Sequence, residues 1–112
     1  MDKPSTKQRL EHICKAILLI QSFVKDQTCD GFLKDIKGQN ATLYQFVIIG
    51  EAIRHIDNSF LNNYQYPWHL PRSFRNFIAH EYHKVKLESV YNAACNLNPL
   101  LKTIETILRK EF

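Results

Sequence analysis

The sequence has few of the residues that interrupt regular structure, with only three glycines and four prolines in 112 residues. Long flexible linkers are rich in such residues, so we expect a mostly ordered, helical chain. No run of about 18 apolar residues occurs, which argues against a membrane-spanning helix. The polar start of the chain also lacks the apolar centre of a secretory signal.

Cysteine is equally sparse. Cys14, Cys29 and Cys95 are an odd number and form no C-x-x-C pair, so neither a disulfide scaffold nor a cysteine-based zinc site is expected. A reducing cytoplasm is the predicted compartment. The net charge of +4 is weakly basic. It is compatible with RNA or with an acidic partner and does not choose between them.

Apolar residues recur at steps of three and four along most of the chain, which indicates an all-α protein. The length fits a single domain over residues 1–112. Ser5 and Gln8 form a capping-box signature for a first helix that reaches about Val24. Later helices are expected at about 28–37, 40–59, from about 70 through the Arg75–His80 segment, and 87–110, with a bend near 95–96 because Pro99 lies inside the last one.

The helix expected at 40–59 has two unusual residues in its apolar pattern. Gly50 is costly in a helix, and close approach of a neighbouring helix is the usual reason to tolerate it. Glu51 needs a partner if it is buried. An arginine at a subunit interface and a solvated position both remain open for it. At the start of this region, Gly38 is expected to end the short second helix.

The segment from Arg75 to Tyr82 reads Arg-Asn-Phe-Ile-Ala-His-Glu-Tyr. A permanent cation close to a group that titrates near neutrality suits chemistry on a phosphate. On an ideal helix, however, Arg75 and His80 point about 140° apart. Either the helix ends between them, or a twofold dimer brings one subunit's arginine to the other's histidine. Tyr82 would lie on the side of Arg75 if the helix continued.

Plainer interpretations stand beside this one. A surface arginine and a capping histidine would produce the same R-x4-H spacing. His80 and His83 superficially resemble a zinc-protease motif, but they are three residues apart where that motif needs four, so no metal is predicted. His12 and His55 are expected to be structural or solvated, and Trp68 to anchor the core.

Five segments in order resemble the HepT-like proteins of the HEPN superfamily. They are Arg9–Ile13, Ile48–Ala52, Tyr66–Trp68, Arg75–Tyr82 and Leu97–Leu100. The chain departs from the pattern of many relatives at two places. Ser73-Phe74 replaces Gly-Met before the motif arginine, and Lys86 replaces an aspartate that would cap the last helix.

The resemblance implies a HEPN-type up-and-down bundle of four main helices plus a short extra helix, which forms a homodimer around R-x4-H. It also implies a metal-independent endoribonuclease without a cofactor, the toxin of a type VII toxin–antitoxin system. Arg75 and His80 would be the catalytic pair, and Asn76 would support phosphate binding. The partner would be a minimal nucleotidyltransferase antitoxin that transfers AMP to Tyr82.

Three alternatives remain open at this stage. The chain would instead be a non-catalytic nucleotide- or RNA-binding partner of the nucleotidyltransferase. Alternatively, the nucleotidyltransferase would be the toxic member of the pair. The third is a helical dimer without chemistry.

Overall fold

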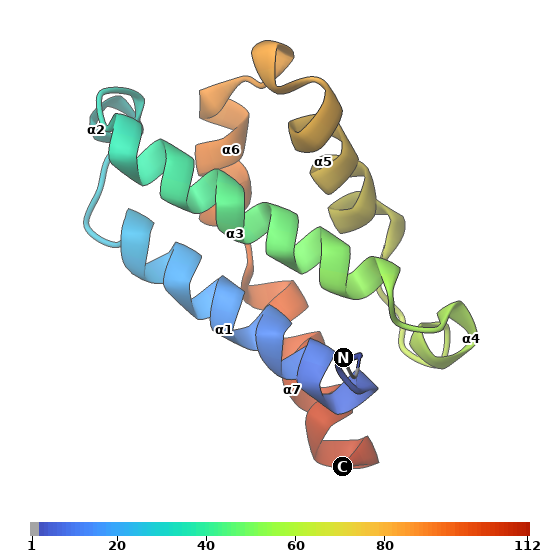
Figure 1. The fold of residues 1–112 in the computed structure, drawn as a ribbon. Coiled ribbons are helices and arrows are strands. Elements are labelled where there is room, and N and C mark those ends of the chain that lie inside the picture. The colour runs from blue at the N-terminus through green and yellow to red at the C-terminus, as the bar shows by residue number, and fades with distance from the viewer. Residues whose placement is uncertain (1–2) are drawn as a thin grey trace.

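The computed structural model describes residues 3–112, which form α-helices and one 3₁₀ turn and contain no strand. The all-α class and the helical-bundle architecture are confirmed. Helix α3 lies against α1 on one side and α5 on the other, and α7 packs against α1 (Figure 1). The elements in order are α1 (Thr6–Val24), α2 (Cys29–Leu33), α3 (Ile36–Arg54), α4 (Asn58–Leu61), α5 (His69–His80), η1 (Tyr82–Lys84), α6 (Leu87–Ala94) and α7 (Asn98–Glu111).

The core is built around α1, which packs against α3 on one side and α7 on another. Burying one such aliphatic side chain stabilises the fold by about 1.5–3 kcal/mol relative to leaving it exposed. The buried aliphatic side chains along each helix therefore determine which face of that helix turns inward. Its fully enclosed members are Leu10, Ile13, Ile17 and Ile20 of α1, Ile49 and Ile53 of α3, and Ile104 and Ile107 of α7.

The predicted capping box of α1 is confirmed. The Gln8 backbone amide donates to Ser5 Oγ at 3.1 Å, and the Ser5 amide donates to Gln8 Oε1 at 2.8 Å. These bonds satisfy donors that the first turn of a helix leaves free. The helix ends at Val24, as expected.

The expected end of the second helix at Gly38 is wrong. Helix α2 is capped by Thr28 but ends already at Leu33. The Gly38 amide donates to the side chain of Asp35 at 2.9 Å, so Asp35 caps α3 and Gly38 belongs to its first turn. The far end of α3 also differs from the prediction. The helix stops at Arg54 and not near 59, because Asp57 caps the separate helix α4.

The bend expected in the last helix is a complete break. Helix α6 ends at Ala94 and α7 starts at Asn98. Pro99 lies in the first turn of α7, where its missing N–H leaves no intrahelical bond unmade. Lys86 precedes α6 and provides no side-chain cap, as its chemistry predicts. Within residues 3–112, no helix combines the length and the apolarity that crossing a bilayer requires.

Candidate functional site

The start of α5 is fixed by Trp68. Its side chain is 5% exposed, and its indole N–H donates to the carbonyl oxygens of Leu61 at 3.1 Å and Tyr64 at 3.2 Å. The predicted core anchor is thereby confirmed. A buried indole with its N–H satisfied holds the loop before α5 at one position, and so sets where the helix begins.

Gly50 determines how closely α5 approaches α3. A Cβ atom placed on Gly50 would lie 2.2 Å from Arg75 Cβ and 2.7 Å from the Pro71 carbonyl oxygen. The close approach predicted for this glycine is confirmed. Because no side chain separates the two backbones there, the stem of Arg75 lies directly on α3.

The guanidinium of Arg75 is held from two directions. Its Nη2 lies 2.9 Å from Glu51 Oε2 on α3, and its Nη1 donates to Asn76 Oδ1 at 3.1 Å. The side chain is only 20% exposed. Its Nε is buried and has no hydrogen-bond partner among the residues that the structure describes. The guanidinium is therefore oriented but still has N–H donors without a partner, since an arginine carries five N–H donors.

The carboxylate of Glu51 lies close to three neighbouring side chains. Oε2 faces Arg75, with Arg54 Nη1 3.7 Å away, and Oε1 is hydrogen-bonded to His55 Nε2 at 2.8 Å. The bond to His55 lowers the pKa of Glu51 most, and the positive charges of Arg75 and Arg54 lower it further. The carboxylate is therefore ionised at neutral pH. The partner left open by the sequence is an arginine of the same chain.

Sequence reasoning missed the part of His55 in this cluster. It was expected to be solvated or structural, and its side chain is indeed 46% exposed. The available signal was its position four residues after Glu51, which places both side chains on one face of α3.

His80 is the last residue of α5 and is exposed. The helix is continuous from His69 to His80, so it neither ends nor distorts between the arginine and the histidine. The roughly 140° separation of an ideal helix therefore applies. Asn76, four residues before His80, lies on its face of the helix and is also exposed. Within one chain, Asn76 bonds to Arg75 and lies on the same face of α5 as His80. Arg75 and His80 themselves point in different directions.

Tyr82 follows the end of the helix. Glu81 leaves helical geometry with φ −130° and ψ 36°, and Tyr82 begins the 3₁₀ turn η1. The alignment of Tyr82 with Arg75 was expected only for a continuing helix, and the helix does not continue to Tyr82. Tyr82 is 76% exposed and meets the ring of His83 edge-on, with 5.7 Å between the ring centroids. Its hydroxyl is accessible to another protein.

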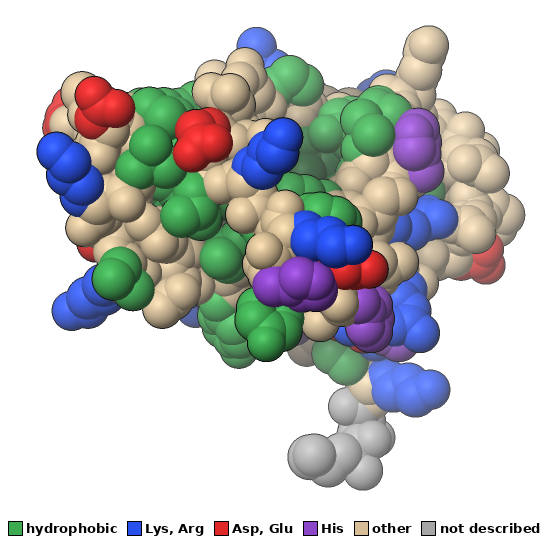
Figure 2. All heavy atoms as spheres, turned by 90° about the horizontal axis from the view of Figure 1, so that it is seen from above, with side chains coloured by type: hydrophobic (Ala, Val, Ile, Leu, Met, Phe, Trp, Pro, Cys, Tyr) green, Lys and Arg blue, Asp and Glu red, His purple; other side chains and the backbone are tan. Residues whose placement is uncertain are grey.

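Charges of both signs surround this end of the molecule. Glu81 Oε2 lies 3.7 Å from both His83 Nε2 and Lys84 Nζ. The view from above in Figure 2 shows histidine side chains next to basic and acidic ones toward the lower edge of the picture. Hydrophobic side chains are exposed across its middle. Over residues 3–112, no group of three or more His, Cys, Asp or Glu side chains is arranged to hold a metal ion.

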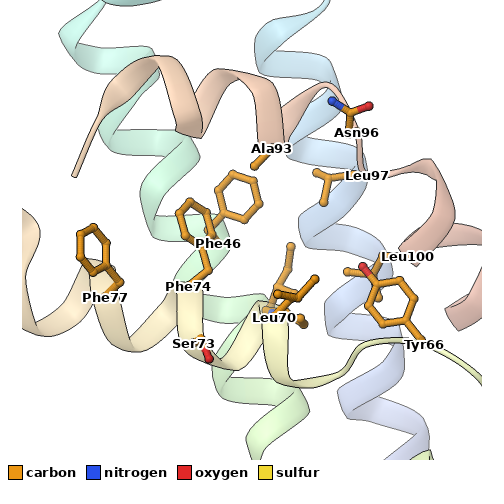
Figure 3. Close-up of a pocket in the computed structure, with 12 residues that line it drawn as sticks. Phe46, Tyr66, Leu70, Ser73, Phe74, Phe77, Ala93, Asn96, Leu97 and Leu100 are labelled. Atoms are coloured by element: carbon orange, nitrogen blue, oxygen red, sulfur yellow. The ribbon is translucent and has the colours of Figure 1, made fainter.

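The apolar side of α5 borders a groove of about 540 Å³ (Figure 3). Phe74 of α5 meets Phe46 of α3 edge-on there, with ring centroids 4.9 Å apart. Phe77 lies at one end of the groove and is 40% exposed. The opposite wall comes from α6 and the break before α7, through Ala93 and Leu97. One face of the motif helix is therefore only partly covered.

Sequence comparison finds relatives that match nearly the whole chain. A candidate RNase of Methanocaldococcus jannaschii is 32% identical over 111 residues, which are 97% of this chain and 92% of that protein. A protein of Thermococcus cleftensis named as a probable ribonuclease HepT is 34% identical over 109 residues, which are 96% and 99% of the two chains. No solved structure matches significantly. Residues 13–107 match the family described as Ribonuclease HepT-like, and the chain therefore belongs to this family of the HEPN superfamily.

Proposed function

We propose that the protein is a metal-independent endoribonuclease, and that it is the toxin of a type VII toxin–antitoxin system. The observation that carries the proposal is the orientation of Arg75. A guanidinium that is mostly buried, held by Glu51 and Asn76, lies on the helix that presents an exposed histidine. Membership in the HepT-like family supports RNA as the substrate.

The active unit is a homodimer. Arg75 and His80 point away from each other on a continuous helix, so one chain does not aim both at a single phosphate. A twofold axis near α5 brings the arginine of one protomer to the histidine of the other and creates two equivalent sites. The partly covered apolar side of α5 supports an interface here.

The reaction is an internal displacement in RNA. The 2′-oxygen bonds to the adjacent phosphorus and loses its proton, while the bond from phosphorus to the 5′-oxygen breaks and that oxygen takes up a proton. His80 supplies one of these proton transfers, which is typically worth about 10²- to 10⁴-fold in rate. Arg75 donates N–H bonds to the phosphate oxygens and stabilises their growing negative charge. Asn76 supports this binding. Because the nucleophile belongs to the substrate, no metal ion is needed to produce one.

Regulation acts through Tyr82. A minimal nucleotidyltransferase partner transfers AMP from ATP to its hydroxyl. The tyrosine oxygen loses its proton and bonds to the α-phosphorus of ATP, while the bond from that phosphorus to the β-phosphate breaks and pyrophosphate leaves. The exposure of Tyr82 supports this role, because the acceptor oxygen must reach the active site of another enzyme. The added anion lies near the phosphate-binding region and repels RNA.

Cleavage assays with purified protein test the catalytic proposal. The parent is expected to cut single-stranded RNA and leave 2′,3′-cyclic phosphate and 5′-hydroxyl ends, and to leave the matching DNA intact. His80→Ala and Arg75→Ala are each expected to lower the rate by at least about 100-fold. His83→Ala is the matched control, since it removes a neighbouring exposed imidazole from outside the proposed site.

Equal cleavage by the parent and either variant would contradict the assigned roles. RNA binding without cleavage, lost in Arg75→Ala, would instead favour the non-catalytic binding subunit. Expression of each gene alone in cells identifies the toxic member of the pair.

A further inference from the structure

The contact between Glu51 and Arg75 joins the two helices at their closest approach. Gly50 leaves no room for a side chain beneath Arg75, and the next residue of α3 provides the carboxylate that faces the guanidinium. Glu51 Oε2 itself is out of contact with solvent. This buried carboxylate oxygen lies beside the positive charges of Arg75 and Arg54, and the bond of His55 to the other oxygen stabilises the ionised form further. The ion pair is therefore part of the local structure and not an incidental surface contact.

We propose that Glu51 is a positioning residue for the ribonuclease reaction, which acts by fixing the direction of the Arg75 guanidinium. The inference rests on the proposed function and deepens it. Glu51 engages Nη2 from α3, while Asn76 engages Nη1 from α5 itself. An ion pair at one terminal nitrogen and a hydrogen bond at the other therefore limit the directions that the guanidinium can take before RNA arrives. Preorganised donors avoid reorganisation during the reaction, which is how such groups stabilise a transition state.

His55 orients the carboxylate in turn. Its Nε2 occupies Oε1, which leaves Oε2 directed at Arg75. His55 lies one helical turn after Glu51, so α3 alone fixes the relation between them. His55 therefore positions Glu51, and Glu51 positions Arg75. Of these three residues, only Arg75 contacts the substrate phosphate.

A carboxylate in this place has two opposing effects. Its negative charge weakens the attraction of Arg75 for a phosphate, while its contact limits the directions that the guanidinium can take. Replacing Glu51 by glutamine removes the charge and keeps the shape. Binding of RNA should then stay equal or tighten, whereas the chemical step should slow because the guanidinium is less well directed. A slower chemical step with equal or tighter RNA binding distinguishes a positioning role from a general loss of structure, which would weaken both.

Steady-state cleavage of one RNA substrate by the parent, Glu51→Gln and the control Glu11→Gln tests the inference. Glu11 is exposed on α1 and has the same charge. For Glu51→Gln we expect kcat to fall at least about tenfold while KM does not rise. The control should match the parent in both constants. Unchanged kcat in Glu51→Gln, or a fall in kcat accompanied by an equal loss in Glu11→Gln, would overturn the proposal.

A double-mutant cycle shows whether Glu51 acts through Arg75. In an Arg75→Lys background, Glu51→Gln should cause less than about a twofold further loss, because the bidentate donor that it directs is already absent. Full additivity would overturn the inference. Arg75→Ala at parental activity would contradict the proposed function itself. An inactive Arg75→Ala with a fully active Glu51→Gln would contradict the positioning role alone.

Discussion

At the residue scale, the candidate groups differ in how exposed they are. Arg75 is mostly enclosed and contacts Glu51 and Asn76, whereas His80 and Tyr82 are exposed at and beyond the end of the helix. A phosphate-binding cation gains from a fixed direction. A proton-transfer group and a modification acceptor need access. The distribution of burial therefore matches the three roles proposed for these residues.

Tyr82→Phe separates catalysis from silencing. The substitution removes the acceptor oxygen and keeps the ring, so RNA cleavage by the purified variant is expected to remain within about twofold of the parent, as for a surface change. Incubation with the nucleotidyltransferase and ATP should then leave the mass of the variant unchanged, whereas the parent gains one AMP. In cells, co-expression of the partner should protect against the parent but not against the variant.

Tyr44→Phe is the matched control, because Tyr44 is also exposed but lies on α3. The Tyr44→Phe variant should accept AMP on Tyr82, as the parent does, and its ribonuclease activity should be inhibited in the same way. Transfer of AMP to Tyr82→Phe at the parental level would place the modification at another residue.

At the scale of helices, the packing of α5 on α3 depends on Gly50. Gly50→Ala is expected to lower the free energy of unfolding by about 1–3 kcal/mol, as overpacking does. This loss runs against the helix propensity of alanine, which favours the substitution by about 1 kcal/mol. The reason is that the added methyl would meet Arg75 Cβ and the Pro71 carbonyl oxygen. Urea denaturation followed by circular dichroism measures the change.

Gly31→Ala is the control for that experiment. A Cβ on Gly31 would come no closer than 3.3 Å to Thr28 Oγ1 and 3.4 Å to Gln27 Cγ, both in side chains that can adjust. It should unfold close to the parent. A Gly50→Ala variant more stable than the parent would mean that the two helices do not approach as closely as described.

The helices were predictable from the sequence where local signals agreed. Ser5 and Gln8 fixed the start of α1, and the cost of Gly50 indicated a close neighbour. The boundaries near Gly38 differ from the prediction because a glycine that often ends a helix here follows Asp35, whose side chain caps α3. A break between α6 and α7 was mistaken for a bend, since Pro99 fits the first turn of a new helix as well as a kink in an old one.

At the scale of the whole molecule, the proposed site depends on the assembly of two protomers. Periodicity predicted the all-α class, and the angle between Arg75 and His80 followed from their spacing. The partner of Glu51 was not predictable, because it depends on how two helices far apart in sequence pack. Which groups a second protomer brings to the site depends on the geometry of an interface, which a pattern within one chain does not encode.

Complementation between inactive variants tests the shared site. Arg75→Ala and His80→Ala are mixed after unfolding and refolding together. Random pairing makes about half of the dimers mixed, and each mixed dimer has one intact site of two, so about a quarter of the parental activity should return. Analytical ultracentrifugation of the parent should show a dimer at micromolar concentration. A monomeric active parent, or a mixture as inactive as its components, would contradict the shared site.

The unbroken course of α5 from His69 to His80 also bears on how the motif tolerates change in length. A single residue inserted between Arg75 and His80 would turn the imidazole by about 100° about the helix axis and move it about 1.5 Å along that axis. Arg75 would stay behind, tethered to α3. If Arg75 and His80 are the catalytic pair proposed above, the number of residues between them matters as much as their identity. Insertions and deletions in this interval should then lower the cleavage rate more than most substitutions within it.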